Sequence, residues 1–317
     1  RGNVKIETNQ IDDQVLLKSD GYPTYHLANV IDDHLMKITH IIRGEEWLTS
    51  VPKHIILYNA FGWEVPKLAH VPLILNPDKT KLSKRQVGDS TRGDVDTEVF
   101  LNKGYLKEAL LNFIALLGWN PGEGESREIF SKEELIKLFT IEKVNSSGAV
   151  FNIEKLNWMN GEYMKNYDLD KLTELALPFL KKAGIDTGDY NKTVKVVSIV
   201  REYIKKLDEI AEYAKVYYQK EVLLTESQRK FLSSDTSTVV LTLLMETLNS
   251  LNEITPDVFR TVLNDIQKQT GIKGKNLYQP IRLALTGQDH GTELGMIAYV
   301  LEKDEILRRI ASYFNSR

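Results

Sequence analysis

Apolar and polar positions alternate in two different ways along the first third of the chain. Short alternating or β-rich runs predict strands at Val4–Glu7, Gln14–Lys18, Lys37–Arg43 and Leu68–Leu75. Between them, apolar side chains recur at helical spacing from Tyr25 to Met36. A second helix is expected from Pro52, whose ring suits a first helical turn, to Ala60. Strands that alternate with helices in this way predict a parallel sheet.

Helical spacing dominates from Asp94 onward. Ser131 and Glu134 form a capping-box pattern at the start of a predicted helix. Apolar residues at helical spacing predict one long helix from Thr193 to Lys220. A further helix is expected to begin at Thr255-Pro256 and to end before Gly271, and two more are expected over Glu293–Leu301 and Glu305–Tyr313. The predicted fold class is therefore α/β followed by all-α.

Length and composition narrow the class of protein. The 317 residues allow two or three domains, and 42% hydrophobic with 27% charged residues is ordinary for a globular protein. No apolar run approaches the ~20 residues that span a bilayer, so no membrane association is expected. The absence of cysteine excludes disulfides and thiolate metal sites, and it favours a cytoplasmic location. The six histidines are scattered along the chain, which predicts no metal cage.

Two local basic patches interrupt a mildly acidic chain of net charge −3. The first is the stretch from Ile266 to Gln288, which contains no acidic residue. The second consists of Lys79, Lys81, Lys84, Arg85 and Arg92. Both patches are suited to phosphate contacts, although ordinary solvated charge explains them equally well.

The second patch contains the most informative motif, Lys81-Leu82-Ser83-Lys84-Arg85, on a polar loop after the apolar run Val71–Leu75. Cations and a hydroxyl on a loop suit a polyanionic leaving group such as pyrophosphate. Alone, such a cluster also fits a solvated loop.

A second candidate site combines Tyr25, Asn29 and Arg43. Tyr25 and Asn29 are four residues apart and share a helix face. Arg43 ends a predicted buried strand, where ligands of α/β sheets usually bind, and its guanidinium suits a carboxylate. The set predicts a pocket for a substrate with an amine and a second carboxylate. The alternative is a core tyrosine, a surface asparagine and an ion-paired arginine.

These motifs occur together with others in a characteristic order. They are Ser19–His34, Ile41-Ile42-Arg43-Gly44-Glu45-Glu46-Trp47, Pro52-Lys53-His54, KLSKR at 81–85, Gly104–Phe113, Phe151–Trp158, Gly271–Lys275 and Arg282–Gly287. In order and spacing the set closely resembles the glutamyl-tRNA synthetases, which are class I aminoacyl-tRNA synthetases. The resemblance covers nearly the whole chain, and KLSKR corresponds to the family's "KMSKS" signature.

The resemblance implies a glutamate–tRNA ligase that uses ATP with Mg²⁺, glutamate and tRNA(Glu). It implies glutamate contacts from Tyr25, Asn29 and Arg43. The implied ATP-binding residues are Lys84, Lys81, Ser83, Glu46 and Trp47, where Trp47 packs against the nucleotide or in the core. Asp32 and Asp33 are adjacent and point apart on a helix, so they are expected to be surface or tRNA-proximal groups rather than a metal pair.

The resemblance also implies an architecture. We expect the second half of a Rossmann-like class I catalytic domain, a mainly helical stem-contact region and a helical anticodon-binding region. The expected segments are residues 1–18, the end of an acceptor-binding insertion; 19–75, catalytic; 76–150, the KMSKS loop and stem-contact region; and 151–317, anticodon-binding. The family's His-x-Gly-His signature does not occur here. We therefore expect a portion of a longer, monomeric enzyme that is inactive by itself.

The acid-free stretch carries the candidate anticodon contacts Lys273, Lys275, Tyr278 and Arg282, of which Arg282 is the one most expected to be structural. Three other readings stay open. A glutaminyl-tRNA synthetase shares the catalytic family but reads the anticodon with β-barrels. A shortened paralogue that modifies a tRNA nucleoside lacks an anticodon-binding region. A non-catalytic tRNA-binding module would not need KLSKR, Tyr25, Asn29 and Arg43.

Overall fold

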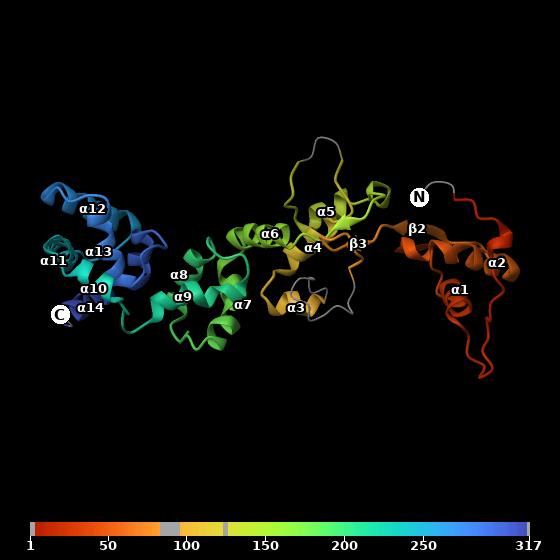
Figure 1. Ribbon diagram of the computed structural model, residues 1–317, viewed down its shortest axis with the longest axis horizontal. Helices are drawn as coiled ribbons and strands as arrows, with labels where there is room; N and C mark the ends of the chain where they lie inside the picture. Colours follow the sequence, from red (N-terminus) through yellow and green to blue (C-terminus); the bar gives the residue numbers. More distant parts are fainter. Residues whose placement is uncertain (1–3, 83–95, 123–125, 316–317) are drawn as a thin grey trace. The chain divides into compact units, whose positions relative to one another are not determined.

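The computed structural model describes residues 4–82, 96–122 and 126–315. The chain forms two compact units. One comprises Arg1–Leu101 with Lys107–Met159, and the other comprises Asn102–Leu106 with Asn160–Arg317. All four strands of the described residues belong to the first unit, and the described part of the second unit is helical (Figure 1). The predicted change from α/β to all-α is confirmed.

The first unit begins with a β–α–β arrangement. Helix α1 (Tyr25–Leu35) precedes strand β1 (His40–Gly44), which leads through the 3₁₀ helix η2 (Glu45–Ser50) into α2 (Val51–Phe61) and β2 (Lys67–Val71). Strands β1 and β2 are parallel, with Arg43 opposite His70. Val30, Leu57 and Tyr58 form the core between the two helices. The carboxyl ends of both strands therefore lie at one edge of the sheet.

The rest of the first unit surrounds a second, smaller parallel pair. Its elements are β3 (Ile74–Leu75), α3 (Thr97–Asn102), α4 (Lys107–Leu116), α5 (Lys132–Leu138), η4 (Ile141–Lys143) and β4 (Ala149–Val150). Helix α6 (Ile153–Asn166) begins in this unit and continues into the second. Strand β3 pairs with β4. The capping box at Ser131 and Glu134 is present, as predicted. Trp119, Phe130 and Leu135 are buried together and hold α5 in place.

The second unit consists of helices in two groups along the chain. The first group is α7 (Leu169–Lys182), α8 (Tyr190–Val200) and α9 (Ile210–Tyr218); the second is α10 (Glu226–Leu232), α11 (Asp235–Asn249), α12 (Pro256–Thr270), α13 (Lys275–Thr286) and α14 (Leu294–Asn315). The predicted limits of α12 are confirmed: the Thr255 side chain caps its start, and Gly271 ends it in the left-handed conformation, with φ 72°. Helix α14 contains a kink at Glu302, which separates the two helices predicted there.

Three of the four predicted strands need correction. Val4–Glu7 and Gln14–Lys18 are not strands, because their apolar side chains are largely exposed and find no sheet to cover; Leu17 makes only an isolated bridge to Pro23. The run Leu68–Leu75 is two strands that pair with different partners. It divides at Pro72, which has no backbone N–H for a sheet.

The long helix predicted from Thr193 to Lys220 is also wrong, because it is broken between Val200 and Leu207. The N–H groups of residues 201–204 still bond back to α8, but beyond them the backbone bonds to other segments. The buried Asn160 donates to the carbonyl of Lys205 at 2.6 Å, and the Leu207 N–H donates to the carbonyl of Gly104 at 3.2 Å. Apolar spacing continues through the break because Ile204 and Leu207 are buried on the same core.

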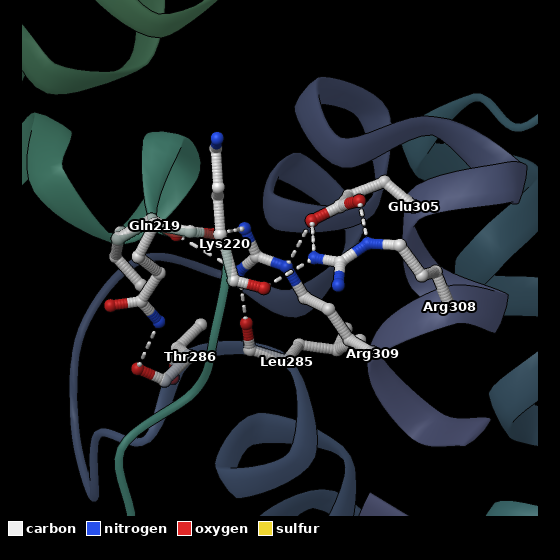
Figure 2. A network of polar contacts seen from close by, with 8 residues as sticks. Gln219, Lys220, Leu285, Thr286, Glu305, Arg308 and Arg309 are labelled. Carbon is white, nitrogen blue, oxygen red and sulfur yellow. Dashed lines mark hydrogen bonds and ion pairs between the residues drawn. The ribbon is translucent and has the colours of Figure 1, made fainter. Parts of the chain in front are cut away.

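A buried arginine joins three helices of the second unit (Figure 2). Arg309 on α14 is 2% exposed and donates to the carbonyls of Val216 at 2.9 Å, Gln219 at 3.0 Å and Leu285. The first two acceptors lie at the end of α9 and the third at the end of α13, where carbonyls have no partner within the helix. Glu305 balances the charge, with its carboxylate 2.7 Å from Nε. The guanidinium thus satisfies two helix C-termini at once.

We predict that Arg309→Ala destabilises the second unit by about 3–5 kcal/mol, because three backbone carbonyls at helix ends lose their donor and Glu305 loses one of its two arginine partners. The matched control is Arg308→Ala, one residue away on the same helix. Arg308 also bonds Glu305 and the Lys220 carbonyl but is nearly half exposed, so its loss should cost about 1 kcal/mol or less. Urea unfolding followed by circular dichroism measures both, and equal costs would contradict the role of Arg309.

Candidate active site

Arg43 lies at the carboxyl end of β1, and neighbouring elements surround it with imidazoles. Its Nε donates to Nε2 of His70, the residue opposite it on β2, at 3.2 Å. Its Nη2 is 3.3 Å from Nδ1 of His54 on α2. His54 in turn is 2.9 Å from His26 of α1, through Nε2 and Nδ1. The parallel register and the following helix therefore bring one arginine and three histidines into one cluster.

The hydrogen-bonding capacity of arginine fixes the protons of this cluster. A guanidinium only donates, so Nε2 of His70 and Nδ1 of His54 must accept. His54 then carries its proton on Nε2 and donates it to Nδ1 of His26. The chain of donors runs from Arg43 through His54 to His26, and all three imidazoles are neutral.

Electrostatics favours the same protonation states. Burial, the Arg43 cation and His26 together lower the pKa of His54 from 6.5 to about 4. Burial also lowers the pKa of His26, helped by Lys53 and Arg43, and lowers that of His70, helped by Arg43. At neutral pH, Arg43 is therefore a cation whose hydrogen-bond partners are uncharged.

Two buried polar atoms of the predicted site residues lack a hydrogen-bond partner among the described residues. They are Nη1 of Arg43 and Oδ1 of Asn29. One is a charged donor and the other an acceptor. Because buried polar groups are nearly always satisfied, such a pair indicates a site that a ligand completes. A carboxylate suits the first and an ammonium the second.

Two exposed aromatic rings border the cluster. The rings of Tyr25 and Trp47 are 4.9 Å apart, and the guanidinium carbon of Arg43 lies 5.9 Å from the Trp47 ring. Tyr25 is 48% and Trp47 36% exposed, so neither is a core residue. Tyr25 and Arg43 both lie near Trp47, while Asn29 shares α1 with Tyr25 and bonds Asp33, whose carboxylate interacts with the Arg43 charge.

Asp33 is partly exposed and contacts Asn29. Nδ2 of Asn29 donates to its carboxylate at 3.2 Å, and burial raises the pKa of Asp33 although Arg43 opposes the shift. This contact orients the Asn29 amide so that Oδ1 is left as an acceptor. Asp33 therefore supports Asn29.

The predicted ATP-binding residues are described only in part. Lys81 and Glu46 form an ion pair, with Nζ 2.7 Å from Oε1, and this hydrogen bond lowers the pKa of Glu46. The pair ties the start of KLSKR to the residue just beyond β1. Ser83 and Lys84 lie outside the described residues.

The four candidate anticodon residues divide into two kinds. Lys273, Lys275 and Tyr278 are exposed at the start of α13, and Nζ of Lys275 lies 6.0 Å from the ring of Phe231. Arg282, by contrast, is partly buried, and its Nη1 donates to the Thr292 carbonyl at 2.8 Å. Arg282 therefore has a structural contact in this unit, whereas the other three present their side chains to solvent.

Within residues 4–82, 96–122 and 126–315, no group of three His, Asp or Glu side chains has the arrangement of a metal site. The cluster at Arg43 fits this finding, because a cation among the imidazoles disfavours a second cation. In the same residues, no helix is both long and apolar enough to cross a membrane.

Comparison with known proteins places both units. Residues 1–158 match the family model of the class I tRNA synthetases (E and Q), catalytic domain, and residues 171–314 match an anticodon-binding domain. The chain is 44% identical to the glutamate–tRNA ligase of Clostridioides difficile (strain 630), covering 100% of this chain and 64% of that protein. It is also 44% identical to the enzyme of Chlorobium luteolum, with 98% and 62% covered.

Among solved structures, a glutamate tRNA ligase from Elizabethkingia meningosepticum, in complex with its amino acid, is similar with a TM-score of 0.84 and 33% identity. The match covers 98% of this chain and 64% of that one. The chain thus spans less than two thirds of the length of these relatives. It belongs to the class I aminoacyl-tRNA synthetases of the glutamate and glutamine family, and the resemblance to glutamyl-tRNA synthetases is confirmed.

Sequence reasoning missed the histidines of this site. His26, His54 and His70 come from three elements and are 16 to 44 residues apart in the sequence, so they were treated as scattered. One signal was available: each histidine lies in a helix or strand that was predicted to belong to the same alternating β and α arrangement as Arg43. The pairing of Arg43 with His70 depends on the register of β1 and β2, which the sequence does not give.

We predict that the first unit loses stability as the pH falls from about 6.5 toward 4. The unfolded chain binds a proton at His54 in this window and the folded chain does not, so acid favours unfolding. Fluorescence reports on this unit alone, because all four tryptophans, Trp47, Trp63, Trp119 and Trp158, belong to it.

The measurement is the urea midpoint of that fluorescence between pH 7 and 5.5, above the range where most carboxylates titrate. His54→Asn, which cannot take up a proton, should reduce the slope. A midpoint that does not fall with pH in the unsubstituted protein would contradict the buried neutral imidazole.

Proposed function

We propose that this chain supplies the glutamate-, ATP- and tRNA-binding residues of a glutamate–tRNA ligase. The observation that carries the proposal is the partly buried Arg43 guanidinium, which bonds two neutral imidazoles and has one nitrogen left without a partner among the described residues. A small dicarboxylic amino acid offers the anion that this cation lacks. A monomeric, cytoplasmic enzyme is part of the proposal.

In this mechanism, Arg43 binds the side-chain carboxylate of glutamate, because the α-carboxylate must remain free to react. Oδ1 of Asn29 accepts from the ammonium group, and Tyr25 and Trp47 border the aliphatic part. Oxygen of the α-carboxylate attacks the α-phosphorus of ATP, and the bond to the β-phosphate breaks to release pyrophosphate. The terminal ribose hydroxyl of the tRNA then attacks the activated carbonyl and AMP leaves.

Charge accumulates on pyrophosphate as it leaves, and KLSKR is suited to neutralise it. Lys84, Lys81 and Ser83 are the proposed contacts, and Glu46 and Trp47 border the nucleotide. The Lys81–Glu46 pair would hold the start of the loop near the strand end. Mg²⁺ would come bound to the phosphates of ATP, whose negative charge it screens; no described side chains are assigned as its ligands.

The main alternative is a glutaminyl-tRNA synthetase, since the family model covers both enzymes. Glutamine would place its amide N–H₂ donors against a guanidinium that also only donates. Its amide carries no charge to balance Arg43. The site therefore favours glutamate, and the helical match to an anticodon-binding domain agrees with that choice over a β-barrel reader.

We predict that two substitutions in the complete enzyme affect different kinetic parameters, one the KM for glutamate and the other the rate of adenylate formation. Arg43→Ala removes a charge-assisted grip worth about 1.5–3 kcal/mol, so the KM for glutamate should rise about 10- to 150-fold with little change for ATP. Lys84→Ala should slow adenylate formation about a hundred- to thousandfold with little change in glutamate affinity. ATP–pyrophosphate exchange with tRNA present measures both. An unchanged glutamate KM in folded Arg43→Ala would refute the proposed substrate site.

We also predict that the acid-free stretch contributes to reading the anticodon. Tyr278→Ala should weaken binding of tRNA(Glu) and leave binding of an anticodon-mutated tRNA nearly unchanged, because a stacked base is lost in the first case only. Lys273→Ala should weaken the binding of both tRNAs. The slope of the logarithm of the binding constant against the logarithm of the salt concentration should fall by about 1, which corresponds to one lost phosphate contact. Tyr190→Ala is the matched control, since both tyrosines are 40% exposed in the second unit. Equal affinity of the unsubstituted protein for both tRNAs would remove anticodon reading from this chain.

A further inference from the structure

We propose that His54 and His70 are positioning residues that hold the Arg43 guanidinium in place by accepting its hydrogen bonds, so that Nη1 faces the substrate. The inference rests on the proposed function, in which Nη1 meets the side-chain carboxylate of glutamate. Neither histidine touches the substrate in this scheme; each acts through Arg43.

Two contacts are enough to set the direction of the third nitrogen. A guanidinium is planar, and Nε and Nη2 of Arg43 are held at 3.2 Å from His70 and at 3.3 Å from His54. Fixing two nitrogens of a planar group fixes the third. Nη1, which has no partner among the described residues, therefore has one orientation before any ligand arrives.

The two histidines are themselves held in position. His54 is 3% exposed and donates to His26 at 2.9 Å, while its ring lies 6.2 Å from that of Tyr25. His70 is fixed by the pairing of β2 with β1, which places it opposite Arg43. One support thus comes from a helix and the other from the sheet.

Imidazole is the suitable acceptor for this task. A carboxylate at either position would hold Arg43 more strongly, but it would also neutralise the charge that the substrate carboxylate needs. A neutral imidazole accepts a hydrogen bond and leaves the cation uncompensated. The groups that face His54 are Arg43, His26 and the ring of Tyr25, and both Arg43 and His26 oppose its protonation.

The test exploits the different lengths of asparagine and glutamine. The amide oxygen of asparagine can replace Nδ1 of histidine, and that of glutamine can replace Nε2. At position 54 the accepting atom is Nδ1, so His54→Asn should keep the contact with Arg43 and His54→Gln should lose it. At position 70 the accepting atom is Nε2, so the preference reverses: His70→Gln should keep the contact and His70→Asn should lose it.

The readout is the KM for glutamate against the KM for ATP in the complete enzyme, by ATP–pyrophosphate exchange with tRNA present. We expect His54→Gln and His70→Asn to raise the glutamate KM roughly tenfold, which is the usual effect of losing a hydrogen bond to a charged group, and to leave the ATP KM unchanged. His54→Asn and His70→Gln should stay within about threefold of the unsubstituted enzyme. The exposed His40→Gln is the control.

The crossed pattern separates positioning from general damage to the fold. If asparagine and glutamine have the same effect at each position, or if glutamate and ATP are affected alike, the two histidines do not position Arg43. If one position does not tolerate substitution, the pair at the other position gives the answer alone. An unsubstituted enzyme that does not use glutamate would instead overturn the proposed function, which is a separate result.

Discussion

The first unit contains a partly buried cation, Arg43, whose hydrogen-bond partners are neutral. Burying a charge is costly unless it is paired, and the usual solution in a protein is a carboxylate in contact. Arg43 bonds two imidazoles instead, and one of its nitrogens has no partner among the described residues. The fold therefore keeps a positive charge only partly compensated. In the proposed enzyme, the carboxylate of glutamate balances this charge. Part of the free energy of binding then comes from relieving the unfavourable desolvation of Arg43.

Arg309 in the second unit shows the opposite arrangement. Its guanidinium is buried, but Glu305 balances its charge and three backbone carbonyls accept its hydrogen bonds. Burial alone would raise the pKa of Glu305. The hydrogen bonds from Arg308 and Arg309 outweigh this effect and lower the pKa, so Glu305 is ionised and forms an ion pair with Arg309. Arg309 stabilises helix ends and has little capacity left for a ligand. Comparing the two arginines distinguishes a binding group from a structural one more clearly than burial alone.

Sequence patterns predicted the fold class and singled out Tyr25, Asn29 and Arg43 as a candidate site, because helix faces and strand ends are local properties. Other features depended on contacts between distant segments. The division of Leu68–Leu75 at Pro72 depends on two different partner strands, and the break after Val200 depends on bonds to Gly104 and Asn160. The histidines around Arg43 depend on the register of β1 and β2. Arg309 resembles other basic residues in the sequence, and only burial and hydrogen bonds reveal its structural contacts. Arg282, the candidate most expected to be structural, does bond the Thr292 carbonyl.

The most direct measurement is a crystal structure of the complete enzyme with L-glutamate and an unreactive ATP analogue. The account predicts that a side-chain carboxylate oxygen of glutamate lies about 2.7–3.0 Å from Nη1 of Arg43, within the range of charge-assisted hydrogen bonds. Nε and Nη2 should remain on His70 and His54, and the α-carboxylate should face the α-phosphate. A structure in which Arg43 binds the α-carboxylate, or leaves both histidines to reach the ligand, would contradict it.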